Sequence, residues 1–266
     1  MRYIVDHDYH IHSQLSLCSQ HPEQTNENIL QYARDNGFSS LCLTNHHWDE
    51  KVEGRLSSFY EVQNYPHIAA ALPLPQGDGI DFYFGCEVDI DRFLRIGIAP
   101  ESYDRFKFIV IPTTHLHMVG FTANEEDLAT PEKRAETWIK RFETVLNADL
   151  PFHKVGLAHL ACHLIAPTRG EYLEVLRLLP TEKLEELFLR AAKRGLGIEL
   201  NYGDFRFSDE EADTVLRIFK IAKQMGCKFY LGSDAHNPTE LLAAPPVFER
   251  AVDLLELSEE DKFHIS

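Results

Sequence analysis

The first stretch of the chain that could do chemistry is Asp8-Tyr-His-Ile-His-Ser13, in which His10 and His12 stand two residues apart. It follows a short apolar run at residues 3–5. In a β-strand, residues i and i+2 point to the same face, so both imidazoles should leave the strand end on one side. Neighbouring neutral imidazoles suit a transition-metal ion such as zinc, which they bind at about 2.0–2.1 Å. The spacing therefore predicts a metal-binding pair.

Further along the chain, histidine and acidic side chains recur at or just after the ends of apolar, strand-like runs. For any one of them a structural role is the simpler interpretation, because the chain has 14 histidines. As an ordered set, however, they predict a metal centre. The set is His46, Glu87, His115, His159, Asp234 and His236. Three positions have a rival nearby: His47 for His46, His117 for His115 and His163 for His159.

Composition limits the kinds of partner. The 266 residues include 42 acidic and 26 basic ones, a formal charge of −16, which argues against a nucleic-acid-binding surface. The five cysteines form no C-x-x-C pair and are odd in number. The start does not resemble a signal peptide, and no apolar run reaches the roughly 18 residues of a membrane span. These features predict a cytoplasmic protein without a membrane or nucleic-acid partner; they leave its oligomeric state open.

The elements that must position these residues are short strands alternating with helices. After the opening motif, strands are predicted at 41–44, 82–86, 106–111, 155–158, 196–200 and 227–231. Helix signals lie between them: Thr25 as an N-cap with Gly37 as the stop, Pro131 at a first helical position, and a Ser208-x-x-Glu211 capping box. This alternation is typical of a parallel α/β fold.

The positions of the polar residues favour a barrel over a doubly wound sheet. In a parallel barrel, active-site residues collect at the carboxyl ends of whichever strands carry them, and nearly every predicted strand here ends in His, Glu or Asp. A doubly wound sheet would concentrate its chemistry at one switch point, usually beside a glycine-rich loop, and the chain has no such loop. We predict a single barrel domain of about seven strands over residues 1–266. It would carry an irregular insertion at 51–79 and a helical tail at 245–266.

Together these residues resemble the polymerase-and-histidinol-phosphatase (PHP) family over roughly residues 6–240. The matching segments are His10-Ile-His12-Ser, Thr-Asn-His46, Gly-Cys-Glu87-Val-Asp, His115, Ala-His159 and Gly-Ser-Asp234-Ala-His236. The run Leu17-Cys-Ser-Gln-His21 is most similar to the histidinol-phosphatase branch. The resemblance implies a distorted seven-stranded (β/α)7 TIM-like barrel that hydrolyses phosphate esters. In three places the chain departs from the family: Asn45 replaces a common Asp, Pro112-Thr-Thr114 replaces a Gly-Ser run, and a Ser-Asp-Gly sequence is absent.

The resemblance also implies three metal centres. The first would be held by His10, His12, Glu87 and Asp234, the second by Glu87 as a bridge with His115 and His159, and the third by His21, His46 and His236. Nitrogen and oxygen ligands together suit Zn, Fe or Mn better than Mg or Ca. We therefore expect two to three divalent transition-metal ions as cofactors. Asp8 would orient a ligand rather than bind directly.

The activity that follows is hydrolysis of a small-molecule phosphate monoester by a hydroxide bridging two metal ions. Glu87 would form the bridge, and Asp234 or His236 would move the leaving-group proton. Arg169 and Arg206 follow predicted strand ends and could grip the phosphate, with a solvated surface position as the alternative.

Two other functions are weighed against it. An amidohydrolase also uses His-x-His on its first strand, but it would not need Glu87 or the final Asp-x-His. A non-catalytic metal-binding module stays open because of Asn45.

Overall fold

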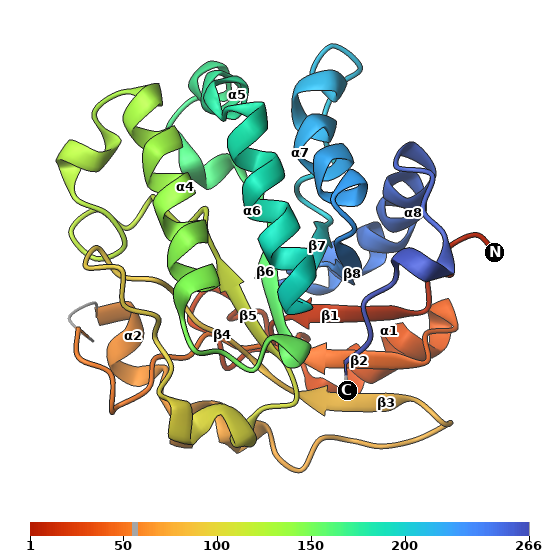
Figure 1. Ribbon diagram of the computed structural model, residues 1–266. Coiled ribbons are helices and arrows are strands. Elements are labelled where there is room, and N and C mark those ends of the chain that lie inside the picture. The colour runs from red at the N-terminus through yellow and green to blue at the C-terminus, as the bar shows by residue number, and fades with distance from the viewer. Residues whose placement is uncertain (55–57, 266) are drawn as a thin grey trace.

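Short apolar strands form the centre of the protein, and most are buried along their whole length, as expected for parallel strands covered on both faces. The computed structural model describes residues 1–54 and 58–265, which contain eight strands in two parallel sheets (Figure 1). The sheets have the orders β1-β2-β3 and β4-β5-β6-β7-β8. The strands are β1 His7–Ile11, β2 Ser40–Leu43, β3 Asp81–Phe84, β4 Cys86–Glu87, β5 Ile109–Pro112, β6 Val155–Ala158, β7 Gly197–Asn201 and β8 Lys228–Gly232.

Helices connect the strands and cover the outside of the sheets (Figure 1). The α-helices of the described residues are α1 Asn26–Asn36, α2 Ser58–Val62, α3 Tyr65–Ile68, α4 Pro131–Asn147, α5 Arg169–Leu178, α6 Thr181–Arg194, α7 Ala212–Gln224 and α8 Pro238–Leu254. Short 3-10 turns lie at η1 Ala69–Ala71, η2 Pro100–Arg105, η3 Glu125–Leu128, η4 Phe152–Lys154, η5 His163–Ile165 and η6 Glu259–Asp261. Within this part of the chain, no helix is both long and apolar enough to span a bilayer.

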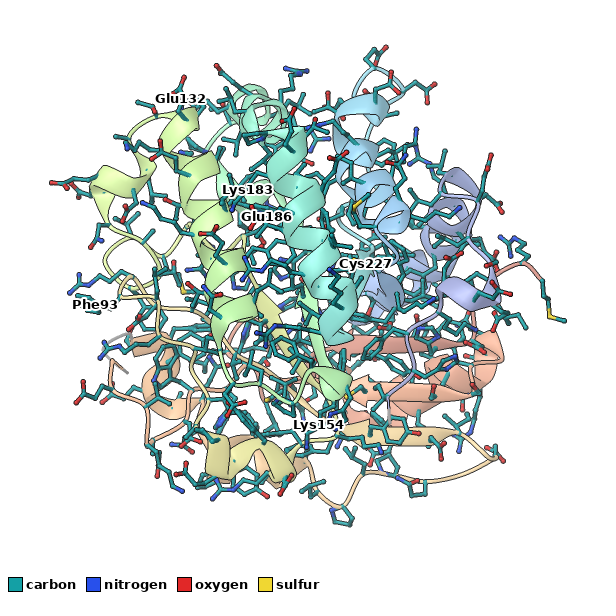
Figure 2. All side chains as sticks on the ribbon, viewed as in Figure 1. Phe93, Glu132, Lys154, Lys183, Glu186 and Cys227 are labelled. Carbon is teal, nitrogen blue, oxygen red and sulfur yellow. The ribbon has the colours of Figure 1, made fainter. Side chains whose placement is uncertain are left out.

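The helices are amphipathic and begin and end at local signals. In α6, Leu184, Leu187 and Phe188 are buried, whereas Lys183 and Glu186 lie on the outer surface as a 2.8 Å ion pair (Figure 2). Thr25 caps α1 as predicted, and Thr130 caps α4 in the same way. Helix α7 begins at Ala212, later than predicted. Its preceding capping-box carboxylate, that of Glu211, still accepts a hydrogen bond from the backbone N–H of Ser208.

The two sheets approach each other at two seams. At the first, β3 and β4 are separated only by Gly85, whose N–H donates to Leu43 while that of Cys86 donates to Phe108. A Cβ at Gly85 would lie 2.5 Å from the Phe108 carbonyl oxygen, so only glycine fits. At the second seam, the backbone N–H of Asp234 donates to His10 at 2.7 Å. The chain after β8 therefore lies beside β1.

The predicted parallel α/β fold is confirmed, and the predicted strand positions agree with it. The prediction of one seven-stranded barrel is met only in part, because the hydrogen-bonded strands form sheets of three and five. There are two causes. The switch of partners at Gly85 divides the predicted strand at 82–86 into β3 and β4. At the second seam, β1 is joined to the residues after β8 by an isolated bridge and not by a continuous strand ladder.

The ends of the chain and the segment after β2 differ from simple expectation. Helix α8 begins before the predicted tail and ends at Leu254; the following residues form η6 and an extended segment. Phe263 in that segment donates its N–H to Phe229 and packs against the Phe108 ring at 5.7 Å between centroids. Within the predicted insertion at 51–79, residues 55–57 lie outside the described residues, and α2, α3 and η1 occupy much of the rest.

Arg141 of α4 ties together the loops that carry several site residues. Its side chain is completely buried and donates hydrogen bonds to the carbonyl oxygens of Ile90, Pro112, Thr113 and Thr122 at 2.7 to 3.3 Å. Two of these acceptors directly precede the loop that contains His115. A single guanidinium therefore satisfies backbone groups that the interior would otherwise leave unpaired.

Replacing Arg141 with Met should lower the free energy of unfolding by about 3 kcal/mol or more, because buried carbonyl oxygens lose their donors. Urea unfolding monitored by circular dichroism would measure the loss. Lys140→Met, at the neighbouring exposed position of α4, serves as the control. Equal stability of the two variants would contradict the role given to Arg141.

Candidate metal centre

The predicted ligands meet at the carboxyl ends of the strands. His10 lies in β1, Glu87 ends β4, and the others follow β1, β2, β5, β6 and β8 in the loops. Eight of the nine predicted metal ligands are brought together in this way, and His21 is not. Most of the eight are buried, with only Asp234 and His236 partly exposed. His159 and Asp234 have positive φ angles of 32° and 52°, which is unusual for residues with side chains and often found at functional sites.

Their ligand atoms form three overlapping groups, each with all atoms within 4.8 Å of one another. The groups are His10, His12, Glu87 and Asp234; Glu87, His115 and His159; and His12, Cys18, His46 and His236. The first two have the membership expected from the sequence. The third contains His46 and His236 but has Cys18 in place of His21.

Glu87 is at the centre of this arrangement. Its Oε2 atom is buried and has no hydrogen-bond partner among the described residues, yet it lies 3.0 Å from His46 Nδ1 and 3.3 Å from His12 Nε2. Its Oε1 atom lies 3.3 Å from His159 Nε2. A buried carboxylate with an unpartnered oxygen is costly unless a cation neutralises it. The donor atoms around Glu87 therefore fit metal ions.

The imidazoles are held in one tautomer by partners outside the centre. His10 donates from Nδ1 to Glu199 at 2.7 Å, and His115 donates from Nδ1 to Asp89 at 3.0 Å. In each case Nε2, which faces Glu87, keeps its lone pair for a metal ion. The other Nδ1 contacts are His12 to Ser16 at 3.0 Å, His46 to Tyr60 at 3.3 Å, His159 to Thr114 at 2.7 Å and His236 to the Asp234 carbonyl oxygen at 2.6 Å.

Glu199 and Asp89 are site residues that the sequence analysis missed. Glu199 in β7 is fully buried and also accepts a hydrogen bond from the His159 backbone N–H at 2.6 Å. Asp89 accepts a hydrogen bond from Tyr60 at 2.6 Å. Asp89 stands two residues after Glu87, and Glu199 two before Asn201. The same i, i+2 rule that singled out the first histidine pair could therefore have found both.

Asn45, the main departure from the family pattern, organises the loop after β1. Its Oδ1 atom accepts hydrogen bonds from the Ser13 backbone at 2.8 Å and from the Ser16 hydroxyl at 3.0 Å, and its amide donates to Ser13 Oγ. The Ser16 oxygen in turn accepts from His12. Asn45 thus helps to orient His12 through Ser16, as a carboxylate in its place also could.

Positive charge near Glu87 is needed to stabilise its buried carboxylate in the ionised form. Burial works against a charged Glu87, but the histidines around it, His46 and His10 above all, hold its pKa well below the ordinary value. Burial also disfavours protonation of His159, yet Glu87 and Asp234 raise its pKa to about 9. Protons and metal ions compete for the same nitrogens, so metal binding here should release protons.

The rival histidines stand apart from the three groups. His47 is buried against Phe106, and neither of its ring nitrogens has a hydrogen-bond partner among the described residues. His117 packs edge-on against His115 and lines the central cavity. His163 lies in η5. His21 is exposed, and its Nδ1 accepts a hydrogen bond from the Glu23 backbone at 3.2 Å.

A cavity of about 370 Å³ opens onto the centre. Ligands from all three groups reach it, together with apolar side chains from the surrounding loops. Its lining residues are Cys18, His46, Phe59, Glu87, His115, His117, Met118, Leu164, Asp234 and His236. Neither predicted phosphate-binding arginine is among them. Arg169 donates two hydrogen bonds to Glu211 at 2.5 and 2.7 Å, and Arg206 lies over the Tyr202 ring at 5.1 Å.

Comparison with known proteins identifies the family. The model of the PHP domain matches residues 8–203, about three quarters of the chain. The protein belongs to the PHP domain family. It is 27% identical over 244 residues to a probable histidinol-phosphatase of Deinococcus radiodurans, covering 88% of this chain and 87% of that one. It is 23% identical to a probable phosphatase of Caldicellulosiruptor saccharolyticus, covering 85% and 79%.

A solved structure shows the same fold. It is the histidinol phosphate phosphatase of Lactococcus lactis in complex with zinc, L-histidinol and phosphate. The two structures superimpose with a TM-score of 0.58 at 18% sequence identity. The alignment covers 92% of this chain and 93% of the Lactococcus lactis chain. The PHP chain described here thus shares its architecture with a structure in which zinc and phosphate are both present.

Changing Glu199 to Gln should weaken metal binding by about 10–100-fold, because His10 loses the carboxylate that fixes its tautomer while the shape of the side chain is kept. Competition with a chromophoric chelator would measure the affinity. Glu186→Gln on the exposed surface of α6 is the control. An affinity equal to that of the control would show that Glu199 does not act through the metal ligands.

Proposed function

We propose that this PHP-family protein is a metal-dependent phosphatase that hydrolyses a small-molecule phosphate monoester of the histidinol phosphate type. The observation that carries the proposal is Glu87, a buried carboxylate with one unpartnered oxygen that is shared by two groups of imidazoles. One relative is named a probable histidinol-phosphatase and another a probable phosphatase. The structurally similar histidinol phosphate phosphatase of Lactococcus lactis was solved with zinc, L-histidinol and phosphate. Family, site chemistry and neighbours therefore point to the same reaction.

Two to three divalent ions, of Zn, Fe or Mn, are proposed as cofactors. The first would be held by His10, His12, Glu87 and Asp234, and the second by Glu87, His115 and His159. Bound there, such ions would supply an activated water and neutralise charge on the phosphate. The carboxylate of Glu87 would keep the two sites together, since its two oxygens face different groups.

The residues of the chain would contribute position and proton transfer. Asp234 and His236 are the ligands with partly exposed side chains, and both line the cavity. In this proposal one of them would pass a proton to the departing alkoxide. Phe59, Met118 and Leu164 give the cavity an apolar wall against which the organic part of the ester would pack. A volume of about 370 Å³ suits a compact alcohol phosphate.

We propose that the two sheets act as one closed barrel of seven strands, with β3 and β4 counted as a single strand bent at Gly85. The hydrogen bonds at both seams support this, because the segments on either side of each seam are already linked through backbone groups. We also propose a reducing, cytoplasmic compartment, since all five cysteines are free thiols.

A screen of phosphate release from amino-alcohol, sugar and nucleotide phosphates with Mn, Zn and Fe would test the proposed phosphatase activity. Absence of turnover with every metal and ester would refute it.

Glu87→Gln removes one anionic ligand atom and the bridge between the two groups. Phosphatase turnover should fall by about two orders of magnitude or more, with loss of at least one metal equivalent by elemental analysis. Circular dichroism should show an unchanged fold. Glu101→Gln, in an exposed 3-10 turn, provides the control. Full metal content with near-normal rates in the Gln variant would remove Glu87 from the mechanism.

The role of the two arginines remains a prediction that kinetics can decide. If either grips the phosphate, its change to Ala should weaken the binding of substrate and of inorganic phosphate, while metal content stays the same. Loss of one charge-assisted contact corresponds to about 1.5–3 kcal/mol. Arg177→Ala, exposed on α5, is the matched control. Unchanged KM in both the Arg169 and Arg206 variants would leave these residues as surface groups, held by Glu211 and Tyr202.

A further inference from the structure

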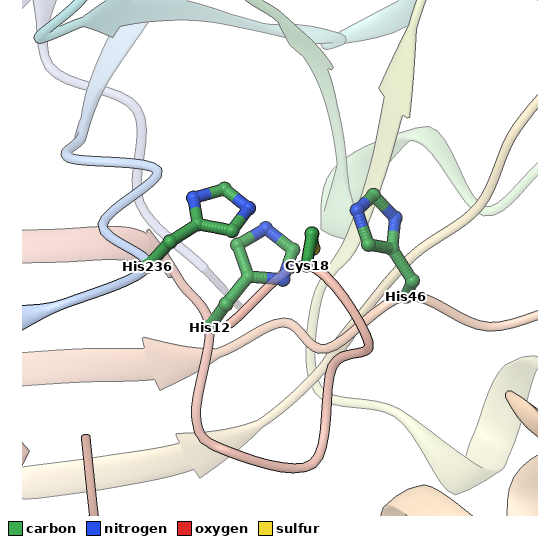
Figure 3. A group of neighbouring side chains, drawn as sticks. All are labelled: His12, Cys18, His46 and His236. Carbon is green, nitrogen blue, oxygen red and sulfur yellow. The ribbon is translucent and has the colours of Figure 1, made fainter. Parts of the chain in front are cut away.

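Cys18 lies among three imidazoles at the edge of the metal centre. Its sulfur and one ring nitrogen each from His12, His46 and His236 are all within 4.8 Å of one another (Figure 3). We propose that Cys18 supplies a thiolate ligand to a third metal ion, together with His46 and His236, in the place that the family resemblance gives to His21. This inference rests on the proposed metal centre. The experiment below distinguishes failure of the Cys18 ligand from failure of the metal centre as a whole.

The hydrogen bonds of the three histidines show which ring nitrogens keep a lone pair for a metal ion near Cys18. His12 donates from Nδ1 to Ser16, and its Nε2 lies 3.0 Å from Asp234, so it is committed to the first group. His236 donates from Nδ1 to a carbonyl oxygen, which leaves Nε2 free. For His46, the Tyr60 hydroxyl donates to Asp89 and its oxygen can therefore accept from Nδ1 at 3.3 Å, which again leaves Nε2.

The loop that carries Cys18 is fixed on both sides of it. Ser16 donates to Asn45 at 3.0 Å and accepts from the His46 backbone N–H at 3.2 Å. Ser19 donates to the carbonyl oxygen of His236 at 2.7 Å. Cys18 thus lies between Ser16, which makes two hydrogen bonds to the loop of His46, and Ser19, which makes one to the loop of His236. Cys18 and His21 are both exposed, but only Cys18 belongs to the group, and one nitrogen of His21 already accepts a hydrogen bond from the Glu23 backbone.

Cys18, His46 and His236 would leave a fourth position of a tetrahedral ion open to the cavity, which all three line. Three protein ligands with one open position are typical of catalytic zinc sites. A divalent cation bound here would hold the Cys18 sulfur as the thiolate, which is the form that ligates metals. A sulfur ligand would make this site prefer Zn²⁺ or Co²⁺ over Mn²⁺, unlike the two all-nitrogen-and-oxygen groups.

Cobalt reconstitution of the full-length chain tests the assignment. The metal-depleted protein loaded with Co²⁺ should show a thiolate-to-cobalt charge-transfer band in the near ultraviolet. Cys18→Ser should abolish the band and lower the bound cobalt by about one equivalent, whereas His21→Ala and Cys162→Ser should retain both. As a second measurement, Zn²⁺ should protect Cys18 of the wild-type chain from alkylation, read by peptide mass spectrometry, and Mn²⁺ should protect it less.

The outcomes separate the two proposals. A band that persists in Cys18→Ser, or cobalt bound without any band, would overturn the Cys18 ligand while leaving the other two groups intact. Loss of one cobalt equivalent in His21→Ala but not in Cys18→Ser would restore His21 as the ligand. A chain that binds no cobalt would overturn the metal centre itself. A cobalt band without phosphatase activity would support the Cys18 ligand and refute the proposed reaction.

Discussion

The structure depends on the burial of one carboxylate among imidazoles. Glu87 is almost completely shielded from solvent, and one of its oxygens has no hydrogen bond from the described residues. Such a group would destabilise the fold on its own. The histidines around it, His46 and His10 above all, compensate part of this charge and hold the pKa of Glu87 well below its ordinary value. If the proposed metal ions complete the compensation, the stability of the fold is coupled to metal binding, because removing either the ions or the histidines leaves a buried charge uncompensated.

The parallel arrangement of strands explains how residues so far apart in sequence reach Glu87. Strand carboxyl ends meet at one rim, so a loop of a few residues after each strand suffices to deliver a side chain. Carboxylates behind the ligands then hold two of the imidazoles in orientation: Glu199 for His10 and Asp89 for His115. Arg141 fixes the loops behind them through carbonyl oxygens. The orientation of the imidazoles thus depends on these carboxylates and on the loops that Arg141 fixes. Those loops depend in turn on the packing of the surrounding helices.

The sequence was sufficient for the fold class and for most of the groups that converge, and the reasons for the misses are local. A polar residue at the end of an apolar run signals a rim position, which located His46, Glu87, His115 and His159. Loop residues lack any such period, and so the positions of Cys18 and His21 could not be distinguished before the hydrogen bonds of Ser16 and Ser19 were known. The change of strand partner at Gly85 depends on close backbone approach, which no hydrophobic pattern reports.

The acidic side chains that line the cavity limit the ways in which a phosphate group could bind there. Among the described residues that line it, charged groups other than histidine are limited to Glu87 and Asp234, both acidic. A phosphate dianion would be repelled by such a surface unless cations reversed its sign. The two arginines predicted from the sequence to bind phosphate have other partners: Arg169 pairs with Glu211, and Arg206 lies over the ring of Tyr202. Binding of the phosphate should therefore depend more on the metal ions than on arginine, with Phe59, Met118 and Leu164 selecting the alcohol.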